Sequence, residues 1–320
     1  MERARAPRQR WEALDDLRGL AILVMVPVNV AATFTAIPAW FKHAPTTGLT
    51  LPDFMVPAFL FSLGLSASFS FRSRVRDRGF SRTLLHAVIR YALLFTFGTI
   101  GILLVDHGTR WETLQMLGAT GLLSFFFLPI PPWPRLAAAA ALLAAVEVLR
   151  PVGLDGLING WFDTGIGGPW GTFSLSFLAI AASALGEMLR DETSGRRLVF
   201  SGVFALVLGA AGLIARAFFP FSKHVLSLSY ILFTAGVSSA LLCLLVLARE
   251  LWGLKLPLTG SMGRNALLLY MLHAVIGVGV QALLGGGASA GAAWGASLLV
   301  LAVCAAAAVV LDRKKIHVKL

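Results

Sequence analysis

Long apolar runs separated by short polar segments are the feature that most limits what this chain can fold into. We identify ten such runs, near 19–38, 52–71, 83–105, 111–130, 134–149, 172–189, 198–219, 226–248, 260–283 and 292–311. Most are long enough, as helices, to cross a hydrocarbon core of about 30 Å. The runs lack the period-two alternation of a membrane barrel, and a helix satisfies its backbone groups internally. The sequence therefore predicts an all-α polytopic membrane protein with about ten transmembrane helices.

Composition agrees with this class and excludes others. Charged residues make up 13% of the chain, whereas soluble domains carry about 25%. The net charge of +11 does not indicate nucleic acid, because the basic residues form short clusters between apolar runs rather than one basic face. We expect the lipid bilayer to be the partner of these clusters. Cys243 and Cys304 both lie inside apolar runs, so neither a disulfide framework nor a thiolate metal site is predicted.

The distribution of Lys and Arg predicts the orientation. Most of the 27 fall on one side of the ten spans, in the N-terminal segment, 72–82, 129–135, 190–197, 249–258 and the C-terminal segment. Because Lys and Arg in short loops mark the cytoplasmic side, both termini are predicted to be cytoplasmic. The chain shows no linker and no internal repeat, so we interpret residues 1–320 as a single transmembrane domain. The opposite side holds Lys42, Arg110, Arg150, Arg216 and Lys223.

One outer loop, WFKHAPTTGLTLPDF at 40–54, carries His43 and Asp53 between two apolar runs. Titratable side chains are costly near lipid and invite a functional explanation. Histidine is the side chain best suited to take and return a proton near neutral pH. The remaining histidines we expect to be solvated residues of loops or helix ends, with His107 as a reserve candidate: His86, His107, His224 and His317.

Polar residues inside the apolar runs form a second group of candidates. Asn29 is predicted to lie about 15 Å deep in the first span, and His273 lies at a similar depth in the ninth. The alternative explanation for each is a hydrogen bond between helices. Gln115, at the outer end of the fourth span, is a candidate for lining the same cavity.

Three arginines are predicted near the cytoplasmic side of three different spans: Arg18, Arg90 and Arg264, the last followed by Asn265. Arginine grips phosphate in a fork geometry, so such a cluster suits a phosphate-bearing ligand. The alternatives are an ion pair between Arg18 and Asp15, and extension of the side chains to the lipid headgroups. Arg90 fits the second alternative poorly, since its side chain begins about 10 Å from the interface.

Five segments, in order, resemble the landmarks of one family: LDDLRGLAILVMVPVNV, WFKHAPTTGLTLPDFMVPAFLFSLGLS, ETLQMLGATG, LSYILFTAG and MGRNALLLYMLH. This is the transmembrane acyltransferase family of heparan-alpha-glucosaminide N-acetyltransferase, and the resemblance extends through nearly the whole chain. It implies a multi-span enzyme that takes an acetyl group from cytoplasmic acetyl-CoA. It also implies delivery to an amino sugar or other glycan acceptor on the extracytoplasmic side, in the plasma membrane of a bacterium.

The resemblance also implies roles for the candidate residues. His43 becomes the catalytic base or acetyl carrier, Asp53 orients it, and Asn29 stabilises the developing oxyanion. Segments that depart from the family pattern, Leu114–Met116 and Phe162–Gly165, lie on the outer side and leave the acceptor open. Asn265 and His273 match the late Asn and His of the family, and with the phosphate-binding candidates Arg18, Arg90 and Arg264 they are predicted to contact acetyl-CoA. Lys42, Gln115 and Asp163 are predicted to contact the acceptor.

Two other functions stay open at this point. A membrane transporter also places Asn, His and Arg along an intramembrane pathway, although the chain lacks internal repeats. An O-acyltransferase acting on a hydroxyl of a surface glycan or lipid would use the same donor. Gly and Ala in the last span suit close helix packing, which is compatible with a homodimer.

Overall fold

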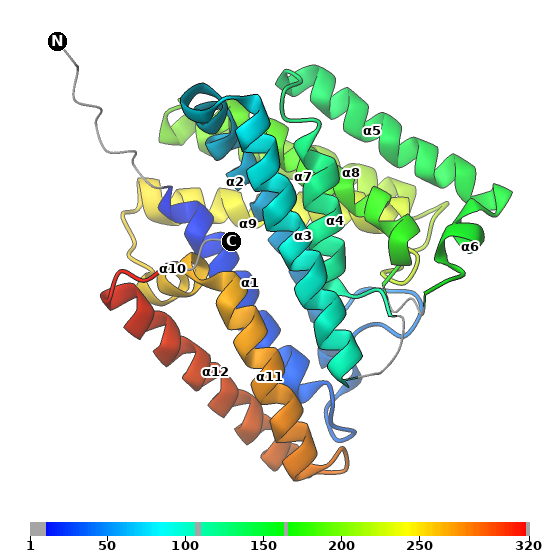
Figure 1. Ribbon diagram of the computed structural model, residues 1–320, viewed down its shortest axis with the longest axis vertical. Coiled ribbons are helices and arrows are strands. Elements are labelled where there is room, and N and C mark those ends of the chain that lie inside the picture. The colour runs from blue at the N-terminus through cyan, green and yellow to red at the C-terminus, as the bar shows by residue number, and fades with distance from the viewer. Residues whose placement is uncertain (1–10, 106–109, 163–165, 318–320) are drawn as a thin grey trace.

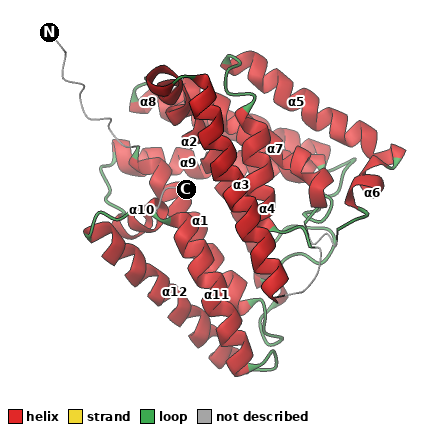
Figure 2. Cartoon of the chain, in the orientation of Figure 1, coloured by secondary structure: helices red, strands yellow, loops and turns green. Residues whose placement is uncertain are grey.

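The computed structural model describes residues 11–105, 110–162 and 166–317 (Figure 1). Every regular element within these ranges is helical, and Figure 2 shows helices joined by loops. Three short 3-10 turns (Ala39–Phe41, Leu51–Phe54 and Arg150–Val152) and a π-helical turn (Leu247–Leu251) join or extend the α-helices. The α-helices are α1 (Glu12–Ala31), α2 (Met55–Arg78), α3 (Phe80–Val105), α4 (Thr113–Phe125), α5 (Pro132–Leu149), α6 (Leu154–Asn159), α7 (Gly168–Leu189), α8 (Ser194–Ala215), α9 (Leu228–Val246), α10 (Pro257–Arg264), α11 (Ala266–Leu284) and α12 (Ala290–Arg313).

The predicted apolar runs coincide with helices, and the helical membrane class is confirmed. Among the described residues, 7 helices are long and apolar enough to cross a membrane, and they comprise α2 with the turn before it, α3, α7, α8, α9 with the turn after it, α11 and α12. The ninth predicted run is divided between α10 and α11, which meet at Asn265. α1 carries Asp15, Asp16 and Arg18 in its first half, and α4 has only 13 residues. The count of about ten spans and the cytoplasmic position of both termini stay predictions.

α7 is the central helix. Of its most apolar 18-residue window 83% is buried, against 11% for α8 and for α11. It packs against α2, α4, α5 and α9, and its many Ala, Ser and Gly residues allow these helices to approach closely. At the crossing with α2, a Cβ on Gly64 would lie 2.1 Å from the carbonyl oxygen of Ala179. Small residues therefore define the α2–α7 contact, while α8 and α11 present most of their surface outward.

α1 and α10 cross even more closely, through a glycine on each helix. A Cβ on Gly19 would lie 1.8 Å from the carbonyl oxygen of Thr259, and one on Gly263 would lie 1.7 Å from that of Asp15. Both obstacles are backbone atoms, which cannot move away by changing a rotamer. The crossing holds the first half of α1 against the helix that precedes α11.

Gly263→Ala is expected to lower the free energy of unfolding by about 1–3 kcal/mol, because the added methyl group overpacks the crossing. Thermal unfolding of the purified protein in detergent, followed by intrinsic fluorescence, measures the change. Gly279→Ala on α11 is the matched control, since no atom lies within 4 Å of the added Cβ. Equal melting temperatures for the two variants would contradict the close α1–α10 crossing.

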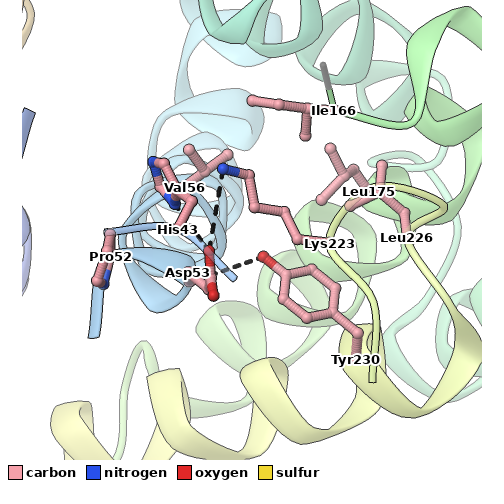
Figure 3. Close-up of a pocket in the computed structure, with 9 residues that line it drawn as sticks. All are labelled: His43, Pro52, Asp53, Val56, Ile166, Leu175, Lys223, Leu226 and Tyr230. Carbon is pink, nitrogen blue, oxygen red and sulfur yellow. Dashed lines mark hydrogen bonds and ion pairs between the residues drawn. The ribbon is translucent and has the colours of Figure 1, made fainter. Parts of the chain in front are cut away.

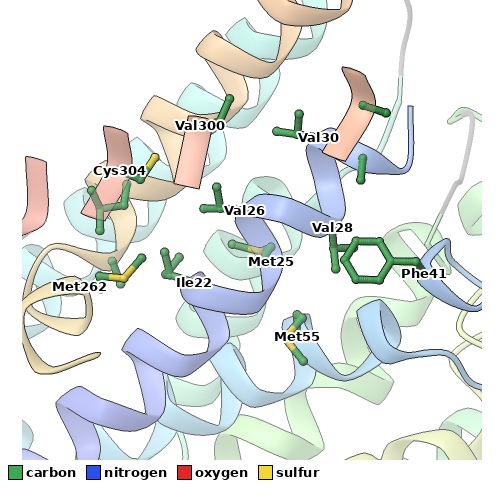
Figure 4. Close-up of a cluster of buried hydrophobic side chains, with 14 of the residues drawn as sticks. Ile22, Met25, Val26, Val28, Val30, Phe41, Met55, Met262, Val300 and Cys304 are labelled. Carbon is green, nitrogen blue, oxygen red and sulfur yellow. The ribbon is translucent and has the colours of Figure 1, made fainter. Parts of the chain in front are cut away.

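The second half of α1 is held by an apolar cluster. Ile22, Met25, Val26 and Val28 pack among side chains from α10, α12, the start of α2 and the Ala39–Phe41 turn (Figure 4). The cluster fixes the rotation of α1 about its axis. The polar side chain of Asn29, which directly follows this apolar stretch, is thereby directed toward α11.

The two ends of α2 have different chemistry. Asp53 lies just before its first turn, whereas Arg72, Arg76 and Arg78 occupy its last turns. Its 24 residues correspond to about 36 Å of helix. Arg72 pairs with Glu187 at the end of α7. The length of one transmembrane helix thus separates the basic end of α2 from the end next to His43 and Asp53. The charge distribution predicted these two ends on opposite sides of the membrane.

Candidate active site

Asp53 is anchored by the loop that leads into α2. Thr50 donates to Asp53 Oδ2 from its backbone nitrogen, at 2.9 Å, and from its hydroxyl, at 2.8 Å. The backbone nitrogen of Ala44 also faces Oδ2, at 3.4 Å. These bonds cap the Leu51–Phe54 turn. The carboxylate is buried, so its position is set by the backbone rather than by solvent.

His43 is bound to the other oxygen of this carboxylate. The distance from His43 Nδ1 to Asp53 Oδ1 is 2.7 Å. A carboxylate only accepts hydrogen bonds, so Nδ1 carries the proton and Nε2 of the neutral ring keeps its lone pair. The His43 side chain is 39% exposed, against 0% for Asp53. The pair therefore presents an oriented base at an accessible position, as in other histidine–carboxylate sites.

A third ionisable residue in this site was missed by sequence reasoning. Lys223 lies in the loop between α8 and α9, and its Nζ is 3.9 Å from Asp53 Oδ1. Its side chain is only 8% exposed. Burial lowers the pKa of Lys223 to about 8, although the charges of Asp53 and Glu112 oppose this shift. The signal available in the sequence was a Lys-His pair between two apolar runs, in the same kind of position as His43.

The loop that carries Lys223 is bonded to the loop that carries His43. His224 Nε2 lies 2.9 Å from the carbonyl oxygen of Ala44. The hydroxyl of Ser222 donates to the carbonyl oxygen of Thr46 at 2.8 Å. The hydroxyl of Tyr230, at the start of α9, donates to the carbonyl oxygen of Asp53 at 2.6 Å. The expectation that His224 is a solvated loop residue is wrong, because the α8–α9 loop folds back onto residues 44–48.

Asn29 and His273 meet between α1 and α11. Asn29 Nδ2 lies 3.1 Å from His273 Nε2, and His273 Nδ1 lies 3.3 Å from the carbonyl oxygen of Leu269. A carbonyl accepts only, so Nδ1 carries the proton and Nε2 accepts from the Asn29 amide. His273 is 3% exposed. This arrangement fixes which way the Asn29 amide points, and its second N–H makes no hydrogen bond within the described parts of the chain.

The space at this site is divided into two small cavities whose linings share His43, Lys223 and Ile166. One borders Asp53 and Tyr230, and the other borders Asn29. Figure 3 shows the part around Asp53, with Lys223 and Tyr230 directed toward that residue. The part that reaches Asn29 has a volume of about 40 Å³, enough for a few water molecules. His43 and Asn29, predicted together from the sequence, therefore face one space. The other residues lining that part are Met25, Pro52, Met55, Val56, Thr113 and Tyr270.

The residues predicted to contact the acceptor lie differently. Lys42 Nζ faces the carbonyl oxygen of Thr35 at 3.5 Å rather than the cavity. Gln115 stabilises the start of α4: its Oε1 accepts from the backbone nitrogen of Glu112 at 2.7 Å, and its Nε2 donates to Thr99 and to the carbonyl of Arg110. Asp163 lies outside the described residues.

The three arginines predicted to form a cluster lie in different surroundings. Arg18 pairs with Asp15 at 3.4 Å and also bonds to Ser66 on α2. Arg264 pairs with Asp312 on α12. α3, which carries Arg90, packs on α2 and α4, whereas α1 and α10 pack on each other.

Two of the predicted donor-binding residues differ in their hydrogen bonding. Asn265 Nδ2 donates to the carbonyl oxygen of Ile316 at 3.2 Å. Arg90 Nε, in contrast, is buried and makes no hydrogen bond within the described parts of the chain. Of the three arginines, Arg90 is therefore the one with a buried N–H donor left for a ligand.

Comparison with known proteins identifies relatives. Residues 10–167 match the family described as heparan-alpha-glucosaminide N-acetyltransferase, catalytic. The heparan-alpha-glucosaminide N-acetyltransferase of Mus musculus is 33% identical over 147 residues, which is 41% of this chain and 22% of that protein. The Homo sapiens protein of the same name is 35% identical over 123 residues, 35% of this chain and 18% of that protein. The match thus spans about a fifth of these relatives. It confirms the resemblance for the three motifs within residues 10–167, whereas the resemblance of the two later motifs stays a prediction.

Proposed function

Because residues 10–167 match the heparan-alpha-glucosaminide N-acetyltransferase catalytic family, we propose that this protein is a transmembrane acetyltransferase. It moves an acetyl group from acetyl-CoA on the cytoplasmic side to an amino sugar or other glycan acceptor on the extracytoplasmic side of a bacterial plasma membrane. The observation that supports this most directly is that His43, bonded to Asp53, lines one cavity together with Asn29. Residues 1–320 act as one acyltransferase domain in this proposal, since α9 and α11 contribute to the same site.

The proposed reaction uses the geometry of this pair. The acceptor nitrogen attacks the thioester carbonyl carbon and gives a proton to His43 Nε2. The carbonyl electrons move to oxygen, where the second N–H of Asn29 donates to the developing oxyanion. The oxyanion then collapses, the C–S bond breaks, and the CoA sulfur takes the proton from His43. Asp53 holds the imidazole and stabilises its charged form throughout.

The donor reaches His43 along α1 in this proposal. From Arg18 to Asn29 the helix measures about 16 Å, a distance that an extended pantetheine arm covers. The cavity near Asn29 has room for an acetyl group but not for the arm, so donor binding has to displace side chains. Met25 and Met55 line this part, and methionine is the apolar side chain that rearranges most readily.

The phosphates of the donor are assigned to Arg90, with Arg18, Arg264 and Asn265 nearer the cytoplasmic end. Arg90 carries this assignment because its buried Nε lacks a partner among the described residues. The acceptor enters where the His43 ring is exposed, beside Lys42. Gln115 receives no acceptor contact in this proposal, because its amide already stabilises the start of α4.

The decisive experiment reconstitutes the protein in vesicles with radiolabelled acetyl-CoA inside and glucosamine outside. We expect labelled N-acetylglucosamine outside, and only when acetyl-CoA is present inside. A parallel series with hydroxyl acceptors separates N- from O-acetylation. Solute counterflow without any dependence on CoA, together with no binding of CoA to the purified protein, would instead support the transporter.

His273→Ala is expected to lower kcat about 10-fold, because an Asn29 amide without its partner no longer holds one orientation, and such preorganisation carries much of oxyanion stabilisation. The KM for acetyl-CoA should stay within about 2-fold, since substrate binding does not use this bond. Steady-state kinetics at saturating acceptor measures both constants. A large rise in KM with unchanged kcat would show that His273 binds the pantetheine arm, as first expected.

A further inference from the structure

Lys223 is a buried cation whose hydrogen-bonding capacity is not used within the described residues. Its ammonium has three N–H donors, yet the separation from Asp53 Oδ1 is 3.9 Å, beyond the 2.7–3.2 Å range of a hydrogen bond. Lysine is almost never this buried unless it is paired. Figure 3 shows its Nζ directed toward Asp53, and Lys223 and His43 line the same cavity.

The position of Lys223 is fixed relative to His43. Besides the contacts of Ser222 and His224 with residues 44–46, the backbone nitrogen of Gly48 donates to the carbonyl of Phe221 at 2.8 Å. The backbone nitrogen of Gly167 donates to the carbonyl of His224 at 2.7 Å. Residues on both sides of Lys223 are thus bonded to other loops. Lys223 lines both the cavity at Asp53 and the cavity at Asn29.

We propose that Lys223 is a catalytic residue of acyl transfer, whose ammonium donates to the carbonyl oxygen of the acyl group as negative charge develops there. This inference rests on the proposed function and adds a charged donor to the neutral one from Asn29. When the acceptor nitrogen bonds to the carbonyl carbon, the carbonyl electron pair moves to oxygen and is stabilised by Lys223. When this electron pair returns to re-form the carbonyl double bond, the C–S bond breaks. Lys223 keeps its proton throughout, and His43 carries the transferred proton.

The location suits an oxyanion more than a permanent ion pair. A preorganised charge on a buried side chain stabilises developing charge strongly, because little solvent has to reorganise around it. The carboxylate of Asp53 is already bonded to His43 and Thr50. It attracts the ammonium of Lys223 by its charge but accepts no close hydrogen bond from it. A developing oxyanion between Asn29 and Lys223 would supply the acceptor that the ammonium lacks.

The inference predicts a pH dependence. The groups around the Lys223 head are the carboxylates of Asp53 and Glu112, the His43 ring and the Tyr230 hydroxyl. With a pKa of about 8, Lys223 is an ammonium below this pH and a neutral amine above it. Because only the ammonium stabilises negative charge, kcat should fall as the pH rises through about 8.

The test compares Lys223→Met and Lys223→Arg in the full-length protein, with radiolabelled acetyl-CoA as the donor. Lys223→Met should lower kcat about 10²–10³-fold, as loss of an oxyanion donor does. Lys223→Arg should keep kcat within about 10-fold and show no alkaline decline up to pH 10, because arginine stays charged. Lys255→Met, which removes an exposed lysine, is the matched control and should leave kcat unchanged.

Two results would overturn the inference while leaving acetyl transfer itself in place. One is a Lys223→Met variant with kcat within about 3-fold of the parent, far from the loss expected of an oxyanion donor. The other is equal loss of kcat in both variants with a matching drop in melting temperature, which would show that Lys223 only supports the fold. A parent protein that transfers no label from acetyl-CoA would instead remove the proposed function, and this inference with it.

Discussion

His43→Ala is expected to lower kcat for acetyl transfer by about 10²–10⁴-fold, the contribution of a positioned general base. The variant removes Nε2, the only ring nitrogen of His43 left as a base once Nδ1 is bonded to Asp53. The KM for acetyl-CoA should change little, because His43 is assigned to the acceptor side. The measurement is the rate of label transfer from acetyl-CoA under saturating donor and acceptor.

His86→Ala provides the matched control for this variant. His86 lies on α3, outside the residues that line the cavity, so its loss should leave kcat within about 2-fold, as for a substitution away from special features. Full activity in His43→Ala would remove the catalytic assignment. Accumulation of a stable acetyl group on His43 in the parent protein would replace the base by a covalent carrier.

Asp53→Asn is expected to lower kcat by about 10³–10⁴-fold and to destabilise the loop as well. Asp53 accepts from His43 Nδ1, from the backbone and hydroxyl of Thr50, and from the backbone of Ala44. An asparagine has one acceptor oxygen, so its amide group must face one or more of these donors. An amide facing His43 would favour the wrong tautomer, which is costly in histidine–carboxylate sites.

Two measurements separate the effects of this substitution. Each buried group left unsatisfied costs about 1–3 kcal/mol of stability, which thermal unfolding in detergent detects. The loss of kcat should persist at temperatures where the variant is fully folded. Asp155→Asn on α6 is the control, since this half-buried carboxylate lies away from the cavities and accepts from the backbone nitrogen of Gly156. Asp53→Asn with more than a tenth of the parent activity would show that the carboxylate does not orient His43.

The sequence was sufficient for the helices and for the central pair, for two different reasons. Apolar runs of membrane length have few alternatives to a helix, because lipid offers no partner for the backbone. His43 and Asp53 were found because their loop is short and both side chains stand between apolar runs. The Thr50 cap then brings Asp53 back to His43, a local effect that the chain encodes within a dozen or so residues.

Lys223 and His224 could not be placed in the same way. A Lys-His pair in an outer loop has no local signal of its surroundings. Lys223 is buried and His224 is half-buried only because the loop between α8 and α9 folds over residues far earlier in the chain. The arginines illustrate the same limit. Depth along a helix can be counted, but the partner of Arg264 is Asp312 on the last helix, and no pattern near either residue indicates this pair.

Tyr230 and Lys223 line the cavity at Asp53 and His273 bonds to Asn29, and all three lie in segments that follow the family match at residues 10–167. Synthesis proceeds from the N-terminus, so α1 and α2 enter the membrane before these partners exist. During that interval the carboxylate of Asp53 has Thr50 and His43 but neither the tyrosine nor the lysine. The site proposed for acetyl transfer is therefore completed only when α9 and α11 have been inserted and packed, which delays its assembly until the protein is nearly finished.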